Sequence, residues 1–240
     1  MSNSAPQVGQ EPTKIQNLFS NISGSYDLAN DLMTFGLARF WRKKVVRLSE
    51  ATTGQSVLDC ATGTGDLAIE FKRSVGTSGY VIGSDFCKSM LDHAPQKAKT
   101  LGLDVHFELG DATALTYDDD QFDVCSIAYG IRNVSDPVKA LSEMARVTKP
   151  GGRVMILETG KPQNPIMGPM IALHFKLFVP IVGWLTSGDH SAYNYLNQSS
   201  TKFPSGVDFL KLMEQTSAFS STSSQSLMGG ASYIYTGIVR

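Results

Sequence analysis

The chain contains few cysteines and no excess of charge. Only three of its 240 residues are cysteines, Cys60, Cys87 and Cys125, and their spacing matches no CxxC redox or zinc motif. We therefore expect reduced packing residues in a cytoplasmic protein that binds no metal. The net charge is −1, from 21 basic and 22 acidic residues, which argues against a nucleic-acid partner held by bulk electrostatics. Residues 1–12 lack the apolar run of a signal peptide and are expected to be disordered.

Apolar strand patterns and helical patterns alternate along the middle of the chain. The expected strands cover residues 57–60, 80–84, 104–108, 122–128 and 153–158, with helices at 66–74, 88–101 and 137–147. Such alternation is typical of βαβ units and a parallel sheet. After a helix at 207–215, strands at 219–227 and 231–239 are joined by Met228-Gly229-Gly230 as a hairpin. Together these elements predict an α/β, Rossmann-like fold: the seven-stranded, mostly parallel sheet of Class I S-adenosylmethionine-dependent methyltransferases, with an antiparallel C-terminal hairpin.

Two segments lie outside this alternation. Residues 13–50 have helical periodicity and are expected to form an N-terminal lid. Residues 160–200 form an apolar insertion before the helix at 207–215, and Lys149-Pro150-Gly151-Gly152 predicts a sharp turn into the fifth strand. We expect both segments to belong to one methyltransferase domain that covers residues 13–240.

A glycine-rich turn follows the first strand and predicts a nucleotide site. The segment from Asp59 through Gly63 and Gly65 joins that strand to a helix, and Asp85 follows about twenty residues after Gly65, where an acidic ribose ligand is expected. A dinucleotide fingerprint needs a third glycine, but residue 68 is alanine. The leading Asp59 would also repel a pyrophosphate. Its carboxylate is instead placed to approach a ligand ammonium group, directly or through water.

These departures favour S-adenosylmethionine, which carries an ammonium, a ribose diol and an adenine but no phosphate. Asp85 is expected to accept hydrogen bonds from the ribose hydroxyls. After the third strand, Asp111 can accept from the adenine amine, while the amide of Ala112 donates to a ring nitrogen. The other interpretation is an unspecialised doubly wound domain with a tight turn.

Further motifs identify a family. They are Tyr26-Asp27-x-x-Asn30-Asp31-Leu32-Met33, Tyr129-Gly130-Ile131-Arg132-Asn133-Val134, Arg146-Val147-Thr148-Lys149-Pro150-Gly151-Gly152 and Leu157-Glu158-Thr159-Gly160-Lys161-Pro162. In this combination the chain resembles the UbiE/MenG family of ubiquinone and menaquinone biosynthesis C-methyltransferases, over roughly residues 15–240. The resemblance implies methyl transfer from S-adenosylmethionine to a ring carbon of a prenylated quinol. Demethylmenaquinol is the expected acceptor, and a 2-methoxy-6-polyprenyl-benzoquinol is the alternative within the family.

The family's cofactor positions fall on Thr64, Asp85, Asp111 and Ala112, and the neighbouring Phe86 is expected at the same site. The chain also departs from the family pattern. Ala128 stands where the family often has serine, so that a hydrogen bond is lost while a backbone contact to the cofactor can remain. Ala61 and Thr62 replace glycines of the general Class I turn, which is tolerable if φ is negative at both positions.

Four residues are candidates for the chemistry at the acceptor. Arg132 is expected to stabilise the oxyanion of the quinol, the alternative being an arginine paired with a carboxylate at the surface. Asn133 either orients this loop or contacts the substrate, and Tyr26 either closes over the cofactor or packs as an aromatic residue. His190 is a candidate base, the alternatives being a solvated loop histidine and a water molecule as the base.

The partner of this protein is expected to be a prenylated quinol, which is a membrane lipid. Residues 166–185 are apolar, but Pro169 and Pro180 argue against a membrane span. This segment is either a helix packed on the domain or a lid for the prenyl tail. The basic cluster between Arg39 and Arg47 is either a solvated helix face or a contact with anionic headgroups at the inner face of the membrane. A transient membrane contact and a homodimer are both compatible with the sequence.

Two further functions remain open at this point. One is a Class I methyltransferase that acts on another small hydrophobic acceptor. The other is a non-catalytic module that binds the cofactor within a quinone-biosynthesis complex.

Overall fold

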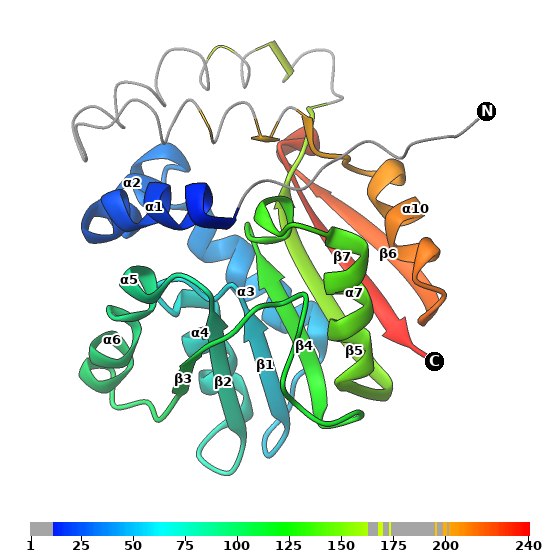
Figure 1. Cartoon of the computed structure of the whole chain (residues 1–240), viewed down its shortest axis with the longest axis horizontal. Helices are drawn as coiled ribbons and strands as arrows, with labels where there is room; N and C mark the ends of the chain where they lie inside the picture. Colours follow the sequence, from blue (N-terminus) through cyan, green and yellow to red (C-terminus); the bar gives the residue numbers. More distant parts are fainter. Residues whose placement is uncertain (1–11, 163–167, 170–172, 174–194, 196–198, 201) are drawn as a thin grey trace.

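The computed structural model describes residues 12–162, 168–169, 173, 195, 199–200 and 202–240 (Figure 1). Within these residues, seven strands form one sheet in the order β3-β2-β1-β4-β5-β7-β6. The strands are β1 (Ser56–Cys60), β2 (Tyr80–Asp85), β3 (His106–Leu109), β4 (Phe122–Ala128), β5 (Thr148–Thr159), β6 (Phe219–Leu227) and β7 (Ser232–Val239). Strands β1 to β5 pair in parallel, and β7 is antiparallel to both β5 and β6. The predicted sheet and C-terminal hairpin are therefore confirmed.

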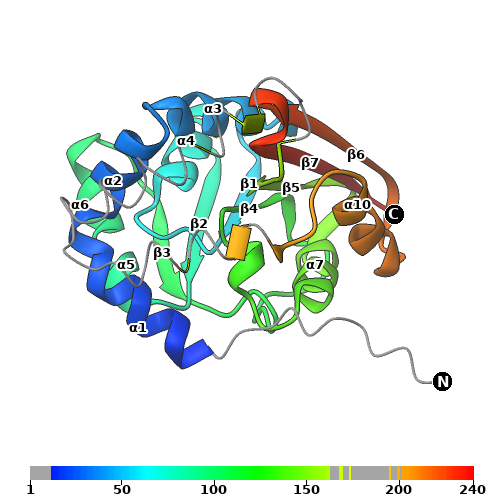
Figure 2. The ribbon, with the colours of Figure 1, turned by 90° about the horizontal axis from the view of Figure 1, so that it is seen from above.

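Helices cover both faces of the sheet. They are α1 (Pro12–Ile22), α2 (Tyr26–Met33), α3 (Leu37–Ser49), α4 (Asp66–Val75), α5 (Lys88–Leu91), α6 (Ala94–Thr100), α7 (Pro137–Arg146) and α10 (Val207–Gln215), with short 3-10 turns η1 (Ser23–Ser25), η2 (Ile131–Asn133) and η3 (Met228–Gly230). Figure 2 shows α3 and α4 on one side of the sheet, with α7 and α10 on the other. Each layer has its own hydrophobic core against the sheet.

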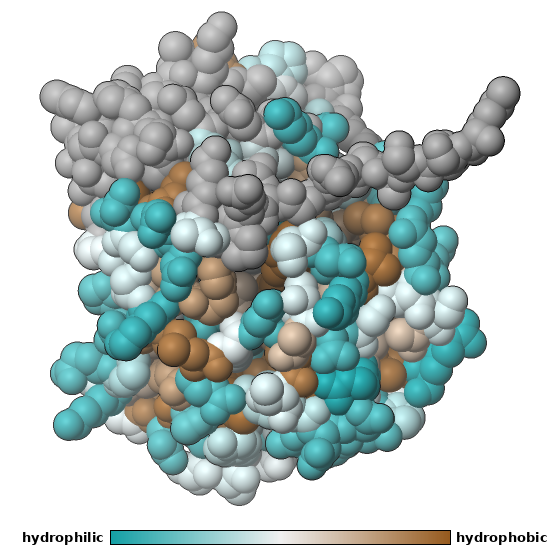
Figure 3. All heavy atoms as spheres, in the orientation of Figure 1, coloured by the Kyte–Doolittle hydropathy of each residue, from teal (hydrophilic) through white to brown (hydrophobic). Residues whose placement is uncertain are grey.

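The central strands are apolar because both of their faces are covered. Val57, Leu58 and Cys60 of β1 are almost completely buried, as expected for a parallel strand inside an α/β sheet. On the surface seen in Figure 3, hydrophobic residues form small groups between hydrophilic ones. Cys60 and Cys125 pack on neighbouring strands with 3.8 Å between their sulfur atoms, and all three cysteines are free thiols. The prediction of reduced cysteines is confirmed for the structure, and Cys87 lies beside the pocket described below.

The chain changes direction between β1 and β4. The connection after β1 leads to α4 on one face, whereas β4 leads to α7 on the other face. The loops at the carboxyl ends of these strands therefore separate and leave room for a ligand. The N-terminal helices lie above this end of the sheet, with α1 packed against α5 (Figure 1).

Three local expectations need correction. The predicted helix at 88–101 is divided into α5 and α6, because Pro95 at the start of α6 lacks the amide hydrogen that a continuous helix needs. The third strand begins at His106 rather than Asp104. The expected negative φ holds for Thr62 but not for Ala61, whose φ is 48°. This conformation costs about 1 kcal/mol in a residue with a Cβ.

The fifth strand is longer than predicted. It begins at Thr148, and the Lys149-Pro150-Gly151-Gly152 turn lies inside it. The register with β4 shifts between Phe122 and Val124, and Gly151 has a φ of 78°. The predicted turn is therefore present as an irregularity that lets β5 continue past it.

Gly65→Ala is expected to destabilise the protein much more than Gly36→Ala. Both glycines precede a helix with positive φ, 84° and 73°. A Cβ at residue 65 would lie 2.9 Å from Ala94 and Phe107, whereas one at residue 36 would meet no described atom within 4 Å. We expect the free energy of unfolding to fall by about 3 kcal/mol in Gly65→Ala and about 1 kcal/mol in Gly36→Ala. Urea unfolding followed by circular dichroism measures both, and equal losses would contradict the packing argument.

Candidate functional site

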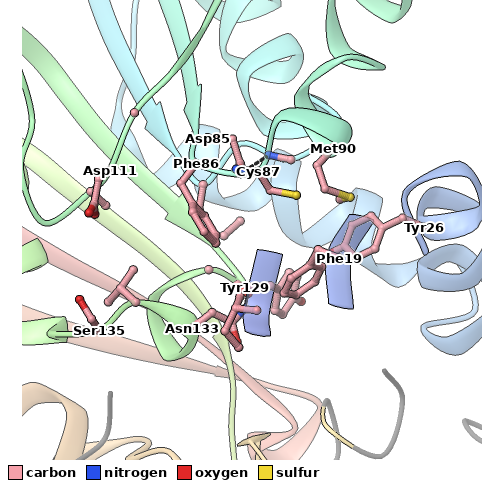
Figure 4. Close-up of a pocket in the computed structure, with 18 residues that line it drawn as sticks. Phe19, Tyr26, Asp85, Phe86, Cys87, Met90, Asp111, Tyr129, Asn133 and Ser135 are labelled. Atoms are coloured by element: carbon pink, nitrogen blue, oxygen red, sulfur yellow. Dashed lines mark hydrogen bonds between the residues drawn. The ribbon is translucent and has the colours of Figure 1, made fainter. Parts of the chain in front are cut away.

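A pocket opens at the carboxyl ends of β1, β2, β3 and β4, beneath α1 and α2. The empty space within it is about 800 Å³, a volume that includes open solvent at its mouth. Loops after the four strands contribute Ala61, Gly63, Asp85, Phe86, Cys87, Gly110, Asp111, Ala112, Ala128, Tyr129, Gly130, Asn133, Val134 and Ser135, and the helices contribute Ile15, Phe19, Tyr26 and Met90 (Figure 4). The structure thus brings together most of the residues predicted to bind the cofactor.

Asp85 organises the loops on one side of this pocket. Its Oδ2 accepts a hydrogen bond from the amide of Gly63 at 2.7 Å, and its Oδ1 accepts from the amide of Cys87 at 2.8 Å. Burial raises the pKa of Asp85, although these backbone amides oppose the shift. Because each carboxylate oxygen has a second lone pair, the side chain can still accept bonds from a ligand diol.

Asp111 and Ala112 form the loop after β3. Asp111 Oδ1 accepts hydrogen bonds from the amide and the hydroxyl of Thr113, both at 2.8 Å. This turn leaves Oδ2 of the exposed Asp111 available for a donor in the pocket. A Cβ at Gly110 would collide with Oγ of Ser84, so the loop packs directly against the end of β2.

Asp59 lies beneath the glycine turn rather than in the pocket. It is 1% exposed, and it accepts hydrogen bonds from Thr62 Oγ1 at 2.6 Å and Ser126 Oγ at 2.7 Å. Burial raises its pKa to about 7, against the effect of the two hydroxyl donors. The bond to Ser126 joins β1 to β4, and the expected approach of Asp59 to a ligand ammonium, directly or through water, stays a prediction.

Thr64 and Gly65 also lie outside the pocket lining. The hydroxyl of Thr64 is buried and donates a hydrogen bond to Asp27 Oδ1 in α2 at 2.6 Å. Gly65 is the first residue before α4 and packs against α6 and β3. Both residues shape the turn from behind, whereas Gly63 of the same turn faces the pocket.

A buried ion pair lies beside the pocket. Arg132 in η2 is bound to Glu158 near the end of β5, and both side chains are almost completely buried. Burial disfavours the charged guanidinium, but Glu158 outweighs this effect and raises the pKa of Arg132. The alternative of a surface arginine is therefore wrong, although the carboxylate partner is present.

Two polar atoms in this region have no hydrogen-bond partner among the described residues. They are Nε of Arg132 and the hydroxyl of Tyr129, and both are buried. Tyr129 lines the pocket with a positive φ of 56°, and burial raises the pKa of its hydroxyl. Unpaired buried donors are costly and commonly mark a binding or catalytic site.

Asn133 and Tyr26 complete this side of the pocket. Asn133 Oδ1 accepts a hydrogen bond from the Tyr195 hydroxyl at 2.9 Å, and its Nδ2 lies 3.4 Å from the carbonyl oxygen of Tyr129. Asn133 therefore orients its loop and also faces the pocket. Tyr26 faces the pocket from α2 and stacks edge-to-face on Phe19. His190 lies outside the described residues.

Several lining residues escaped prediction as site residues. Ile15 and Phe19 form an apolar wall, and their spacing along α1, continued by Ile22, is the signal that indicated a buried helix face. Glu158, which lies beside the pocket and not in its lining, was noted only as part of a sequence motif. Its pairing with Arg132 depends on contact between β5 and η2. Cys87 and Met90 carried no sequence signal beyond apolar character.

The described residues contain neither a metal centre nor a spanning helix. No group of three or more histidine, cysteine or acidic side chains in this part of the chain could hold a metal ion. No helix within it combines the length and the apolar character that a membrane crossing requires.

The fold and the pocket are those of a Class I methyltransferase. Solved structures of similar fold include a SAM-dependent methyltransferase from Thermotoga maritima, with a TM-score of 0.66 at 18% identity over 94% of this chain and 100% of that one. Another, from Aquifex aeolicus, has a TM-score of 0.59 at 18% identity over 96% of this chain and 100% of that one.

Sequence comparison gives the family. The ubiE/COQ5 methyltransferase family model matches residues 7–239. A Bdellovibrio bacteriovorus protein named ubiquinone/menaquinone biosynthesis C-methyltransferase UbiE is 50% identical over 240 residues, which are 100% of each chain. A Staphylococcus carnosus demethylmenaquinone methyltransferase is 37% identical over 95% of this chain and 93% of the relative. The chain belongs to the ubiE/COQ5 methyltransferase family, and the predicted S-adenosylmethionine-dependent methyltransferase is confirmed.

Asp59 is expected to make stability fall as the pH rises. Its pKa is raised to about 7 in the folded protein, so the folded state binds the proton more tightly than the unfolded state does. The resulting stabilisation is complete below about pH 4 and is lost as the pH rises through about 7. Between pH 4 and 8, this effect should lower the free energy of unfolding of the parent protein by about 2–4 kcal/mol. Asp59→Asn keeps a neutral hydrogen-bonding group that does not titrate, so its stability should not show this fall. Urea unfolding of both proteins across this range measures the difference, and parallel pH profiles would contradict it.

Proposed function

We propose that this protein transfers the methyl group of S-adenosylmethionine to a ring carbon of a prenylated quinol, with demethylmenaquinol as the preferred acceptor. The observation that carries the proposal is a pocket lined by Asp85 and Asp111 at the carboxyl ends of the strands, beside a buried, incompletely paired arginine. The names of the relatives from Bdellovibrio bacteriovorus and Staphylococcus carnosus support a quinone-pathway acceptor. S-adenosylmethionine supplies an activated methyl group on its sulfonium, so the protein has to align the acceptor and stabilise its charge.

We place the cofactor along the loops after β1, β2 and β3. Asp85, held by two backbone amides, accepts the ribose hydroxyls in this arrangement. Asp111 Oδ2 and the Ala112 amide then face the adenine, and Phe86 provides an apolar surface beside it. The backbone near Gly63 and Ala128 lines the remaining length of the cofactor.

The acceptor is expected on the side of Arg132. Glu158 holds one terminal nitrogen of the guanidinium, which leaves Nε free of any described partner. When the quinol hydroxyl loses its proton, the ring carries an enolate-like charge, and the buried cation stabilises that oxyanion. A dry site strengthens this attraction over its strength in water. His190 and a water molecule both remain predictions for the base that removes the proton.

We place the transient membrane contact on the outer face of α3. Phe40, Lys43, Lys44 and Arg47 follow the i, i+3, i+4, i+7 spacing opposite the buried Val45. Phe40 is 68% exposed, and none of the three cations forms an ion pair with a described residue. Such a face suits anionic headgroups, which attract each cation by about 1 kcal/mol. The predicted homodimer stays a prediction.

Co-sedimentation with vesicles tests this contact. The protein is expected to sediment with vesicles that contain phosphatidylglycerol and to remain in solution with purely zwitterionic vesicles. Lys43→Gln combined with Lys44→Gln should weaken binding about 30-fold, since each cation near the surface contributes about 1 kcal/mol. Equal binding to both kinds of vesicle, or by both proteins, would contradict an electrostatic contact.

Turnover of demethylmenaquinol with S-adenosylmethionine tests the function itself. Mass spectrometry should show a quinol that has gained one methyl group. Arg132→Ala is expected to lower kcat about 100-fold or more with little change in cofactor affinity, because it removes the oxyanion partner. Asp85→Ala should do the reverse and mainly weaken binding of S-adenosylhomocysteine, measured by calorimetry.

Two matched variants make the arginine test specific. Arg132→Lys keeps a cation for Glu158 but removes Nε, so kcat should fall while the thermal midpoint stays close to that of the parent protein. Arg153→Ala breaks another arginine–glutamate pair, with Glu50, at the opposite end of β5 and should retain kcat. Near-normal turnover in the folded Arg132 variants would rule out the oxyanion role.

A further inference from the structure

The Tyr26-Asp27-x-x-Asn30-Asp31 motif has contacts that the proposed chemistry does not use. It forms most of α2, and its two acidic residues bind different neighbours. Asp31 pairs with Arg39 within the N-terminal helices. Asp27 instead binds residues outside these helices, while Tyr26, next to it in sequence, faces the pocket.

Asp27 is the centre of a chain of polar contacts. Its Oδ1 accepts a hydrogen bond from Thr64 Oγ1 at 2.6 Å, and its Oδ2 lies 2.5 Å from Lys97 Nζ. Lys97 Nζ is also 2.5 Å from Asp66 Oδ1, and Asp66 Oδ2 is 2.7 Å from Arg42. This chain joins α2 to the glycine turn, α6, α4 and α3.

These contacts are partly shielded from solvent. The side chains of Lys97, Asp66 and Arg42 are 29%, 29% and 11% exposed, and that of Asp27 is 40% exposed, so solvent screens the Asp27–Lys97 pair more than the Arg42–Asp66 pair. Two ion pairs of the described residues connect residues 12–33 to the remainder of the protein: Asp31–Arg39 leads to the adjacent α3, and Asp27–Lys97 leads to α6 across the pocket-forming loops. Phe19 and Tyr26, which lie in that segment, line the pocket on the side of Met90 (Figure 4).

We propose that Asp27 and Lys97 are positioning residues that latch α1 and α2 closed over the cofactor, and that this latch limits release of S-adenosylhomocysteine. The inference rests on the cofactor placement proposed above. It also explains the position of Thr64, whose hydroxyl contributes to the site by holding the lid. The spent cofactor leaves when Asp27 separates from Lys97 and Thr64, which moves the aromatic wall away from the pocket.

The test compares Asp27→Asn and Lys97→Met with Lys88→Met in the full-length protein. Lys88 forms a lysine–aspartate pair with Asp92 on the neighbouring α5, but its side chain is 67% exposed, so it is a matched control. Both latch variants should raise the Kd for S-adenosylhomocysteine about fivefold, and the double variant should raise it no further, because all three lack the same ion pair. Lys88→Met should bind as the parent protein does.

Hydrogen exchange of the S-adenosylhomocysteine complex separates a latch from a general loss of stability. Deuterium uptake should increase in peptides from residues 12–33 and stay unchanged in peptides from β4. Unchanged affinity and uptake in both latch variants would overturn the proposal, and so would an equal increase in all peptides. The parent protein could bind S-adenosylhomocysteine and yet fail to methylate a quinol, which would contradict the proposed acceptor. The affinity and exchange measurements would still decide whether the latch exists, because they do not involve the acceptor.

Discussion

The carboxylate of Asp59 connects the two halves of the sheet at the point where the pocket opens. It is bonded to Thr62 in the turn after β1 and to Ser126 in β4. The chain leaves these two strands toward opposite faces, so the turns at their ends diverge and form opposite walls of the pocket. Every lining residue after β1 or β4 therefore depends on how this pair of strands is held together.

Two different electrostatic environments occur at this end of the sheet. Around Asp85, backbone amides stabilise a carboxylate that retains acceptor capacity for a neutral ligand. Around Arg132, a buried carboxylate stabilises a cation that retains donor capacity for an anion. In the proposed arrangement, hydrogen-bond acceptors face the cofactor and hydrogen-bond donors face the quinol, as methyl transfer to a quinol requires. The fixed positions of these groups mean that little reorganisation is needed during the reaction.

Sequence patterns predicted the strands well and the helix boundaries less well. The apolar residues of buried parallel strands such as β1 are visible in the sequence, whereas the helical pattern at 88–101 continues across the break that Pro95 imposes between α5 and α6. Ala61 illustrates a different limit. A negative φ was the reasonable expectation for an alanine, and the surrounding turn holds it at 48° instead.

What the sequence determined by itself was the order of the elements, the family and the acidic residue at the end of β2. Periodicity, glycine positions and contiguous motifs are local properties of the chain, so they can be recognised without knowledge of tertiary contacts. Only the tertiary structure decided that Asp59 lies beneath the turn, that Arg132 is paired with Glu158, and that Thr64 faces Asp27. Each of these contacts joins residues far apart in the chain. The direction in which a polar side chain points at the end of a strand depends on the neighbouring strand or helix that supplies its partner, and a local pattern carries no record of that neighbour.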